Sequence, residues 1–479
     1  MMMIDAQTRC RDAIEARERG SIDLALELFE QAAAAAPDDV VVRAERGLTY
    51  MMTGNLQAAE DDFRAVNQLQ PGNPDVLINL AALLQHRGHL HEAISLYRAV
   101  LEAVDDAVEV RCNLAKALAD CGNSVDALVE ADIAVSQGVG GRGSLATRGA
   151  VLIDAGNYAA AHDTLTRAIE KEPANDMALV NLALCSQQLD DLQSAITFLI
   201  RAVELNPHNA RAVADLVNAF SAVGENAQAV SLADSFLNEH PGERLVVAAV
   251  AQALLNAGDT ERARSLTDIE ALVQVIDLPA PAGFDDADEF HRTLADELLS
   301  DPSLLHDPVN KATTGGAQTG ELDLRASNAK TAFAGLADAA IRAAVTTYQQ
   351  SGLRDHPVML PATDDWSLRA WGTVIEAGGQ QTPHMHPLGW LSAVYYVDLP
   401  AGMSGNSEDG WLEFGRPPER LYCKTQPESR RYEPRAGRMV IFPSWFWHRT
   451  LTFASAPGEA APRISIAFDV LPANRLGRL

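Results

Sequence analysis

Two histidines separated by one residue stand where a loop gives way to an apolar segment. His384 and His386 precede the β-branched and aromatic run 390–397, which predicts a buried strand. In an extended chain, residues i and i+2 point to the same side, so both imidazoles can face one point. The pair could therefore bind one metal ion. Two loop histidines with no metal are the more common origin of such a pattern, so residues elsewhere must decide.

Two later segments supply further residues of the same kind. The strand predicted at 438–448 ends on His448. The strand predicted at 463–469 begins with Arg463 and carries Ser465 on the same side. Two neighbouring histidines, a third from a distant strand and an arginine on the strand after that would form a facial iron site. Such a site leaves open positions for a chelating acid and for dioxygen.

Together these motifs resemble the 2-oxoglutarate- and Fe(II)-dependent oxygenases. The branch that they resemble has HxH, then Ser-x-Val-Tyr-Tyr, then Phe-Pro-Ser-Trp-x-x-His, then Arg-x-Ser-x-x-Phe, and all four stand here in that order. The resemblance implies that His384 and His448 bind iron and that Arg463 pairs with the distal carboxylate of 2-oxoglutarate. A planar guanidinium makes that contact well. Ser465 and Tyr396 are candidates for hydrogen bonds to the same carboxylate.

The chain departs from the commonest family pattern at one position. The usual second ligand is a carboxylate, as in HxD or HxE, whereas this chain has His386. Either His386 completes a three-histidine site, or the iron keeps two protein ligands and one more open position. Because imidazole suits Fe(II), we expect His386 to bind the metal. The resemblance covers roughly residues 366–472, and its motifs are specific only in combination.

The first part of the chain repeats with a period of 34 residues. A glycine or an aspartate marks each unit, and an alanine follows five residues later in every one. The marking residues are Gly20, Gly54, Gly88, Gly122, Gly156, Asp190, Gly224 and Gly258, and the alanines are Ala25, Ala59, Ala93, Ala127, Ala161, Ala195, Ala229 and Ala263. Glycine permits a tight turn with positive φ, and alanine lets two helices cross closely. This is the pattern of tetratricopeptide repeats, and eight units fit.

These patterns predict a multidomain protein. Residues 1–277 are expected to form an all-α tetratricopeptide solenoid. Residues 278–365 are expected to be a linker followed by two helices, about 286–300 and 329–351, with an irregular segment between them. Residues 366–479 are expected to form the double-stranded β-helix, a jelly roll, that the resemblance implies. The two helices would back the sheet.

Composition excludes several classes of function. The formal net charge of −27 argues against nucleic-acid binding, which needs clustered Lys and Arg. No run of eighteen apolar residues predicts a membrane helix, and the charged N-terminal stretch does not fit a signal peptide. The 5 cysteines are scattered and lack a CxxC motif, which is typical of a reducing compartment. We therefore expect a cytoplasmic protein without nucleic-acid or membrane partners.

We interpret the chain as a 2-oxoglutarate/Fe(II)-dependent dioxygenase, a hydroxylase that uses Fe(II), 2-oxoglutarate and dioxygen. The concave face of a repeat solenoid normally holds peptides or proteins, so the expected substrate is a protein or peptide recruited there. Two alternatives stay open: a catalytically inactive scaffold that binds partners through the repeats, and a three-histidine iron dioxygenase that does not use 2-oxoglutarate. The loop 416–438 carries seven basic and three acidic residues. It could attract an acidic substrate, although a solvated surface paired with acidic neighbours is the commoner case.

Overall fold

The computed structural model of the protein describes residues 5–138, 143–309, 311–360, 363, 365–400, 403, 408–454 and 461–472. The chain falls into two compact units, the first ending at Ser144 and the second running from Leu145 to Pro472. None of the helices in the described ranges combines the length and the apolar composition that crossing a membrane requires.

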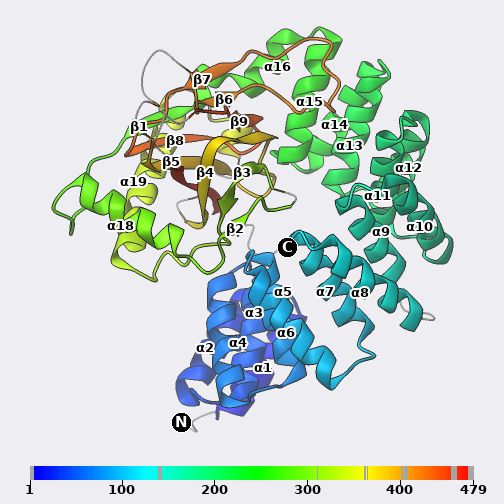
Figure 1. The fold of residues 1–479 in the computed structure, drawn as a ribbon, viewed down its shortest axis with the longest axis vertical. Coiled ribbons are helices and arrows are strands. Elements are labelled where there is room, and N and C mark those ends of the chain that lie inside the picture. Colours follow the sequence, from blue (N-terminus) through cyan, green and yellow to red (C-terminus); the bar gives the residue numbers. More distant parts are fainter. Residues whose placement is uncertain are drawn as a thin grey trace. The chain divides into compact units, whose positions relative to one another are not determined.

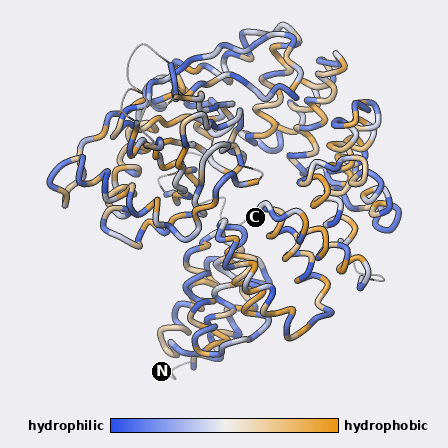
Figure 2. The backbone as a smooth tube through the Cα atoms, in the orientation of Figure 1, coloured by the Kyte–Doolittle hydropathy of each residue, from blue (hydrophilic) through white to orange (hydrophobic). Residues whose placement is uncertain are grey.

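The first unit is a stack of helix hairpins (Figure 1). Its helices are α1 (Ala6–Glu18), α2 (Ile22–Ala35), α3 (Val40–Met52), α4 (Leu56–Leu69), α5 (Pro74–His86), α6 (Leu90–Ala103), α7 (Val108–Asp120) and α8 (Ser124–Gln137). Ala25, Ala59 and Ala93 are fully buried where the helices of a hairpin cross. Hydrophobic and hydrophilic stretches alternate along each helix, as the packing of one face requires (Figure 2).

The second unit continues the same pattern and then changes architecture. Its repeat helices are α9 (Ser144–Asp154), α10 (Tyr158–Lys171), α11 (Asp176–Gln188), α12 (Leu192–Leu205), α13 (Ala210–Ala222), α14 (Asn226–Glu239), α15 (Arg244–Ala257) and α16 (Thr260–Thr267), followed by the short α17 (Ile269–Leu272). Asp190, the one marking residue that is not glycine, adopts the same positive φ, 61°. The predicted all-α tetratricopeptide solenoid is thus confirmed.

The rest of the second unit is a curled antiparallel sheet. Its strands are β1 (Gln274–Asp277), β2 (Leu305–His306), β3 (Thr313–Gln318), β4 (Trp366–His384), β5 (Leu391–Asp398), β6 (Leu412–Phe414), β7 (Arg430–Tyr432), β8 (Arg438–Pro443), β9 (His448–Thr450) and β10 (Arg463–Pro472). The pairing order is β1-β8-β5-β10-β4-β9-β6-β7, and β3 also pairs with β4. The first half of β4 pairs with β10, and its end pairs with β9. The sheet therefore curls along β4, which confirms the predicted jelly-roll class.

Two helices support this sheet, as the sequence predicts. They are α18 (Ala287–Leu299) and α19 (Asn328–Gln350). Phe333 of α19 packs against Tyr395 and Phe468 of the sheet, with ring centroids 5.6 and 5.8 Å away. The segment between the helices is not irregular throughout, because it contains β2 and β3. Its glycines allow this: a Cβ at Gly316 would lie 2.4 Å from the carbonyl oxygen of Val374.

The last repeat shares a hydrophobic core with the sheet. Val247 and Ala248 of α15 belong to the same buried cluster as Trp390 and Tyr395. β1, which precedes the boundary predicted at residue 277, pairs with β8 and so belongs to the sheet.

A polar side chain of α15 adds to this contact. Asn256 donates to the Ser221 hydroxyl at 2.9 Å and to the Tyr422 carbonyl at 3.1 Å, and it accepts from the Lys424 amide at 2.9 Å. Its side chain therefore joins two repeats to the loop between β6 and β7.

We expect Asn256→Ala to lower the free energy of unfolding of the second unit by about 2 kcal/mol, because it leaves buried partners without hydrogen bonds. Urea unfolding followed by tryptophan fluorescence measures this, since all 6 tryptophans lie between residues 366 and 447. The control Asn238→Ala, at an exposed position of α14, should change the value by less than about 0.5 kcal/mol. Equal midpoints for the two variants would contradict a role for Asn256 in this joint.

Candidate metal centre

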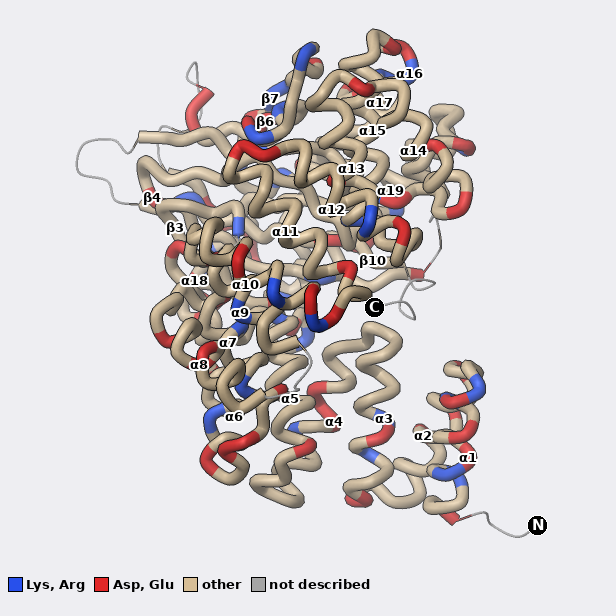
Figure 3. The backbone as a smooth tube through the Cα atoms, turned by 90° about the vertical axis from the view of Figure 1, so that its right-hand side faces the viewer, with Lys and Arg blue, Asp and Glu red and all other residues tan. Residues whose placement is uncertain are grey.

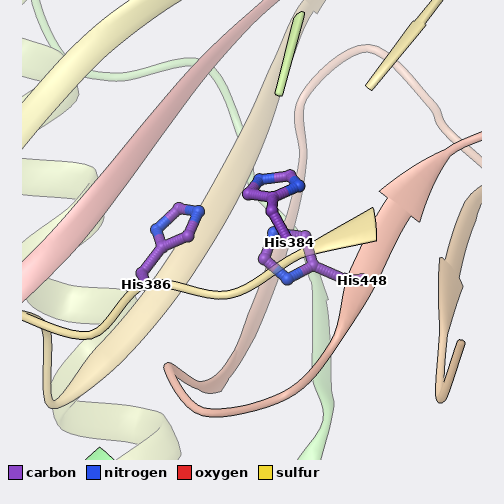
Figure 4. A group of neighbouring side chains, drawn as sticks. All are labelled: His384, His386 and His448. Carbon is purple, nitrogen blue, oxygen red and sulfur yellow. The ribbon is translucent and has the colours of Figure 1, made fainter. Parts of the chain in front are cut away.

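Three histidines meet where β4, β9 and the segment before β5 converge. His384 is the last residue of β4, and His448, the first residue of β9, is its register partner. One ring nitrogen from each of these two and from His386 lies within 4.8 Å of the others. The ring centroids are 4.2 Å apart for His384 and His448, 5.0 Å for His386 and His448, and 5.2 Å for His384 and His386. Figure 4 shows the three imidazoles gathered around one space.

Each imidazole has a hydrogen-bond acceptor at Nδ1. Nδ1 of His384 lies 2.8 Å from the carbonyl oxygen of Thr382, and Nδ1 of His448 lies 2.9 Å from that of Phe446. Nδ1 of His386 lies 2.6 Å from Oδ1 of Asp469. A carbonyl or a carboxylate only accepts, so Nδ1 carries a proton in each ring, and in the neutral ring Nε2 keeps its lone pair. All three rings thus hold the tautomer in which Nε2 can bind a metal.

Burial keeps two of these rings neutral. Desolvation lowers the pKa of His384 to about 3, and the neighbouring His386 lowers it further in the same direction. Desolvation also lowers the pKa of His448 well below its usual value. Because metals bind the neutral imidazole, the environment favours the form that ligation requires.

The same pocket contains an arginine suited to an anion. Arg463 is only 1% exposed, and among the described residues neither Nε nor Nη1 has a hydrogen-bond partner. Its Cζ lies 5.0 Å from the ring centroid of Tyr396, whose hydroxyl is also without a partner there. Ser465 follows on β10 and is in register with Tyr396. Buried donors of this kind are nearly always satisfied, so a bound anion or an ordered water would have to supply the missing acceptor.

One pocket of about 390 Å³ joins these groups. The three histidines, Arg463 and Ser465 all line it, together with apolar side chains such as Phe442. The structure therefore brings the three predicted metal-binding residues and two of the three predicted anion-binding residues, Arg463 and Ser465, into one space. Tyr396 is not part of the lining and lies behind Arg463.

Asp469 is a further residue at this site that the sequence motifs do not mark. This residue is 6% exposed, and its Oδ1 accepts from His386 and also from the Ser392 hydroxyl at 2.6 Å. A signal was present, because Arg463, Ser465, Ala467 and Asp469 alternate along β10 and therefore share one face of the strand.

The basic loop 416–438 is largely neutralised. Arg430 pairs with Glu270 and Glu428, Arg431 with Glu408 and Glu413, Arg435 with Glu433, and Arg438 with Asp277. These pairs favour the interpretation of a surface matched to acidic neighbours over that of an open anion trap.

Comparisons with known proteins agree with this division of the chain. Residues 369–469 match the family model described as "Putative 2OG-Fe(II) oxygenase", a range that contains all the predicted site residues. Residues 10–74, 50–111 and 152–220 match tetratricopeptide-repeat models.

Individual proteins are similar to parts of the chain. A Drosophila melanogaster protein named "BBSome complex member BBS4 homolog" is 25% identical over 176 residues, which cover 36% of this chain and 36% of that protein. A tetratricopeptide repeat protein from Parabacteroides merdae shares 13% identity over 52% of this chain and 98% of its own, with a TM-score of 0.46. Yeast Tom70 shares 14% identity over 57% of this chain and 61% of its own, also with a TM-score of 0.46.

We expect the protein to bind about one equivalent of Co(II), used as a stable substitute for Fe(II), and His448→Ala to weaken that binding by about 100-fold or more. Even residues that contact a metal-binding side chain without touching the metal change metal affinity by about 10- to 100-fold when they are mutated. Calorimetric titration measures the affinity.

The matched control is His208→Ala. It disrupts a second, exposed cluster formed with Glu239 and His240 on the repeats. His208→Ala should bind Co(II) as tightly as the wild-type protein. If His208→Ala lost tight Co(II) binding and His448→Ala kept it, the metal site would lie on the repeats instead.

Proposed function

We propose that this chain, in which tetratricopeptide repeats precede a C-terminal domain of the 2OG-Fe(II) oxygenase family, is a 2-oxoglutarate- and Fe(II)-dependent dioxygenase. One observation carries the proposal: three imidazoles that each place Nδ1 against an acceptor share a pocket with a buried guanidinium whose Nε and Nη1 find no acceptor among the described residues. The first feature suits a divalent metal, and the second suits a carboxylate.

The residues present fit both groups. His384, His386 and His448 would hold the metal, and imidazole is a ligand that Fe(II) accepts readily. Arg463 would pair with the distal carboxylate of 2-oxoglutarate, and Ser465 could add a hydrogen bond from the same strand face. When bound, Fe(II) supplies the redox chemistry that couples the conversion of 2-oxoglutarate and dioxygen into succinate and carbon dioxide with hydroxylation of a substrate.

The chain's own contribution is placement and exclusion of water. Arg463 is held at the start of β10, so its distance from the histidines is fixed by the sheet rather than by a loop. Phe442 and Leu412 are almost fully buried and line the pocket with apolar surface. An apolar lining excludes water, which strengthens the attraction between the guanidinium and a carboxylate.

The proposed substrate is a protein or peptide that the repeats recruit. Tetratricopeptide repeats mediate contacts between proteins, and their concave faces suit extended segments. The last repeat is also hydrogen-bonded to the segment that carries His386. Nε of Arg244, on α15, donates to the carbonyl of Gly389 at 2.9 Å, three residues after His386. A polypeptide held by the repeats of the second unit would therefore have a fixed position relative to the histidines.

The charge of the protein bears on the partner as well. Acidic residues are distributed along the helices of both units (Figure 3), and Asp and Glu number 65 against 38 Lys and Arg. A partner with a basic segment would be attracted, whereas nucleic acid would be repelled. The 5 cysteines are all free, which suits the reducing cytoplasm that we propose as the location.

We expect the purified protein with Fe(II) to convert 2-oxoglutarate into succinate, and Arg463→Ala to raise the apparent KM for 2-oxoglutarate by about 100-fold. Truncating one partner of a buried charge pair costs about 2–5 kcal/mol, which agrees with that factor. Chromatographic measurement of succinate against 2-oxoglutarate concentration gives the KM. The control Arg435→Ala removes an exposed arginine paired with Glu433 and should leave the KM unchanged.

Two results would refute the proposal in different ways. An unchanged KM in Arg463→Ala would show that the carboxylate of 2-oxoglutarate binds elsewhere than at Arg463. A wild-type protein that neither binds 2-oxoglutarate calorimetrically nor releases succinate would favour a three-histidine dioxygenase that does not use 2-oxoglutarate if it binds Co(II), and an inactive scaffold if it does not.

A further inference from the structure

We propose that Asp469 supplies, through His386, the negative charge that the metal centre lacks when the usual carboxylate ligand is replaced by histidine. The inference rests on the proposed function in requiring a metal at the three histidines, and it does not require turnover. Asp469 would act as a positioning residue, since it touches a ligand and not the metal.

The three imidazoles differ in what accepts their Nδ1 proton. His384 and His448 each donate to a neutral backbone carbonyl two residues earlier in the chain. His386 instead donates to a carboxylate from β10, 83 residues away in sequence, at 2.6 Å. That distance is at the short end for a hydrogen bond from a ring N–H to a carboxylate. The histidine at the position where related proteins carry the anionic ligand is therefore the one that contacts an anion.

The carboxylate is built into the sheet. Asp469 is in register with Ser392 on β5, and the Ser392 hydroxyl donates to the same Oδ1 at 2.6 Å. Gly389 lies against it from the other side: a Cβ at Gly389 would be 3.1 Å from both Cβ and Cγ of Asp469. A side chain at residue 389 would press on Asp469 and on the Leu391 carbonyl, so that one of them would have to shift by a few tenths of an ångström.

A metal ion bound to His386 would balance the negative charge of Asp469. Among the described residues, Asp469 forms no ion pair with lysine or arginine, and its one charged or chargeable contact is His386. A buried carboxylate is costly unless a positive charge lies close. A divalent cation on Nε2 of His386 would provide that charge across the ring. The carboxylate in turn fixes the ring orientation and makes the imidazole a stronger electron donor to the metal.

The barrel contains a second buried carboxylate that is handled differently. Glu413 is fully buried, and its two oxygens accept from Nε of Arg431 at 2.8 Å and from Nε of Arg449 at 2.5 Å. Its charge is balanced by arginines and needs no metal. Glu413 is therefore a matched reference for a buried carboxylate without a metal role.

The test is the affinity for Co(II) in the absence of 2-oxoglutarate, measured by calorimetry and by the visible absorption of bound Co(II). Asp469→Asn keeps the size of the side chain and an oxygen acceptor but removes the charge. We expect it to weaken Co(II) binding by about 10- to 100-fold. Ser392→Ala leaves the charge and removes one hydrogen bond, and should weaken binding by less than about tenfold. Glu413→Gln should leave the affinity unchanged. Tryptophan fluorescence of each variant establishes that it is folded.

Wild-type affinity in folded Asp469→Asn would overturn the inference, and so would an equal loss in Glu413→Gln. These outcomes are separate from a failure of the proposed function. If the wild-type protein binds Co(II) and Asp469→Asn binds it more weakly, the inference stands even where no succinate forms. If succinate forms and Asp469→Asn binds Co(II) normally, the inference fails alone. A wild-type protein that binds no Co(II) would overturn both.

Discussion

An imidazole presents Nε2 to a metal only when its Nδ1 proton has an acceptor, and the sheet satisfies this condition at three points at once. For His384 and His448 the acceptor is a carbonyl two residues earlier, so the local chain bend alone fixes the tautomer. For His386 the acceptor comes from β10, so the sheet must be closed before the third ring is oriented. The long β4, which pairs with β10 at one end and β9 at the other, is the element that closes it.

The helical repeats are also part of this arrangement. Arg244 is fully buried at the start of α15, and it donates to the Gly389 carbonyl. The same carbonyl accepts from the Ser444 hydroxyl, and the Ser444 carbonyl accepts from the amide of His386. A chain of three hydrogen bonds thus connects the last repeat with a candidate metal ligand. The last repeat is therefore linked to the segment that carries His386.

The sequence predicts those features whose cause is local. Each repeat position has its own steric reason, and even Asp190 takes the positive φ that its place in the period requires. The convergence of the histidines could be expected from strand alternation. The sequence does not predict β3, because Thr-Thr-Gly-Gly-Ala-Gln lacks the alternation of a strand. The segment can pair with β4 because Gly316 has no Cβ, which would clash with the β4 backbone. The Gly378-Gly379 pair is typical of a turn, whereas β4 continues through it. The sequence does not predict Asp469 as a site residue, because its hydrogen-bond partner His386 is 83 residues away.

Two buried charged side chains in the barrel differ in whether they have partners. In this barrel Glu413 meets two arginines, which is how a buried charge is stabilised when it serves structure alone. Arg463 is buried to the same degree, yet two of its nitrogens have no acceptor among the described residues. Such an unpaired group destabilises the fold. A barrel kept only as a scaffold would gain stability by replacing Arg463 with an apolar residue. Its presence opposite three correctly oriented imidazoles is therefore the strongest structural argument for a carboxylate ligand in the pocket.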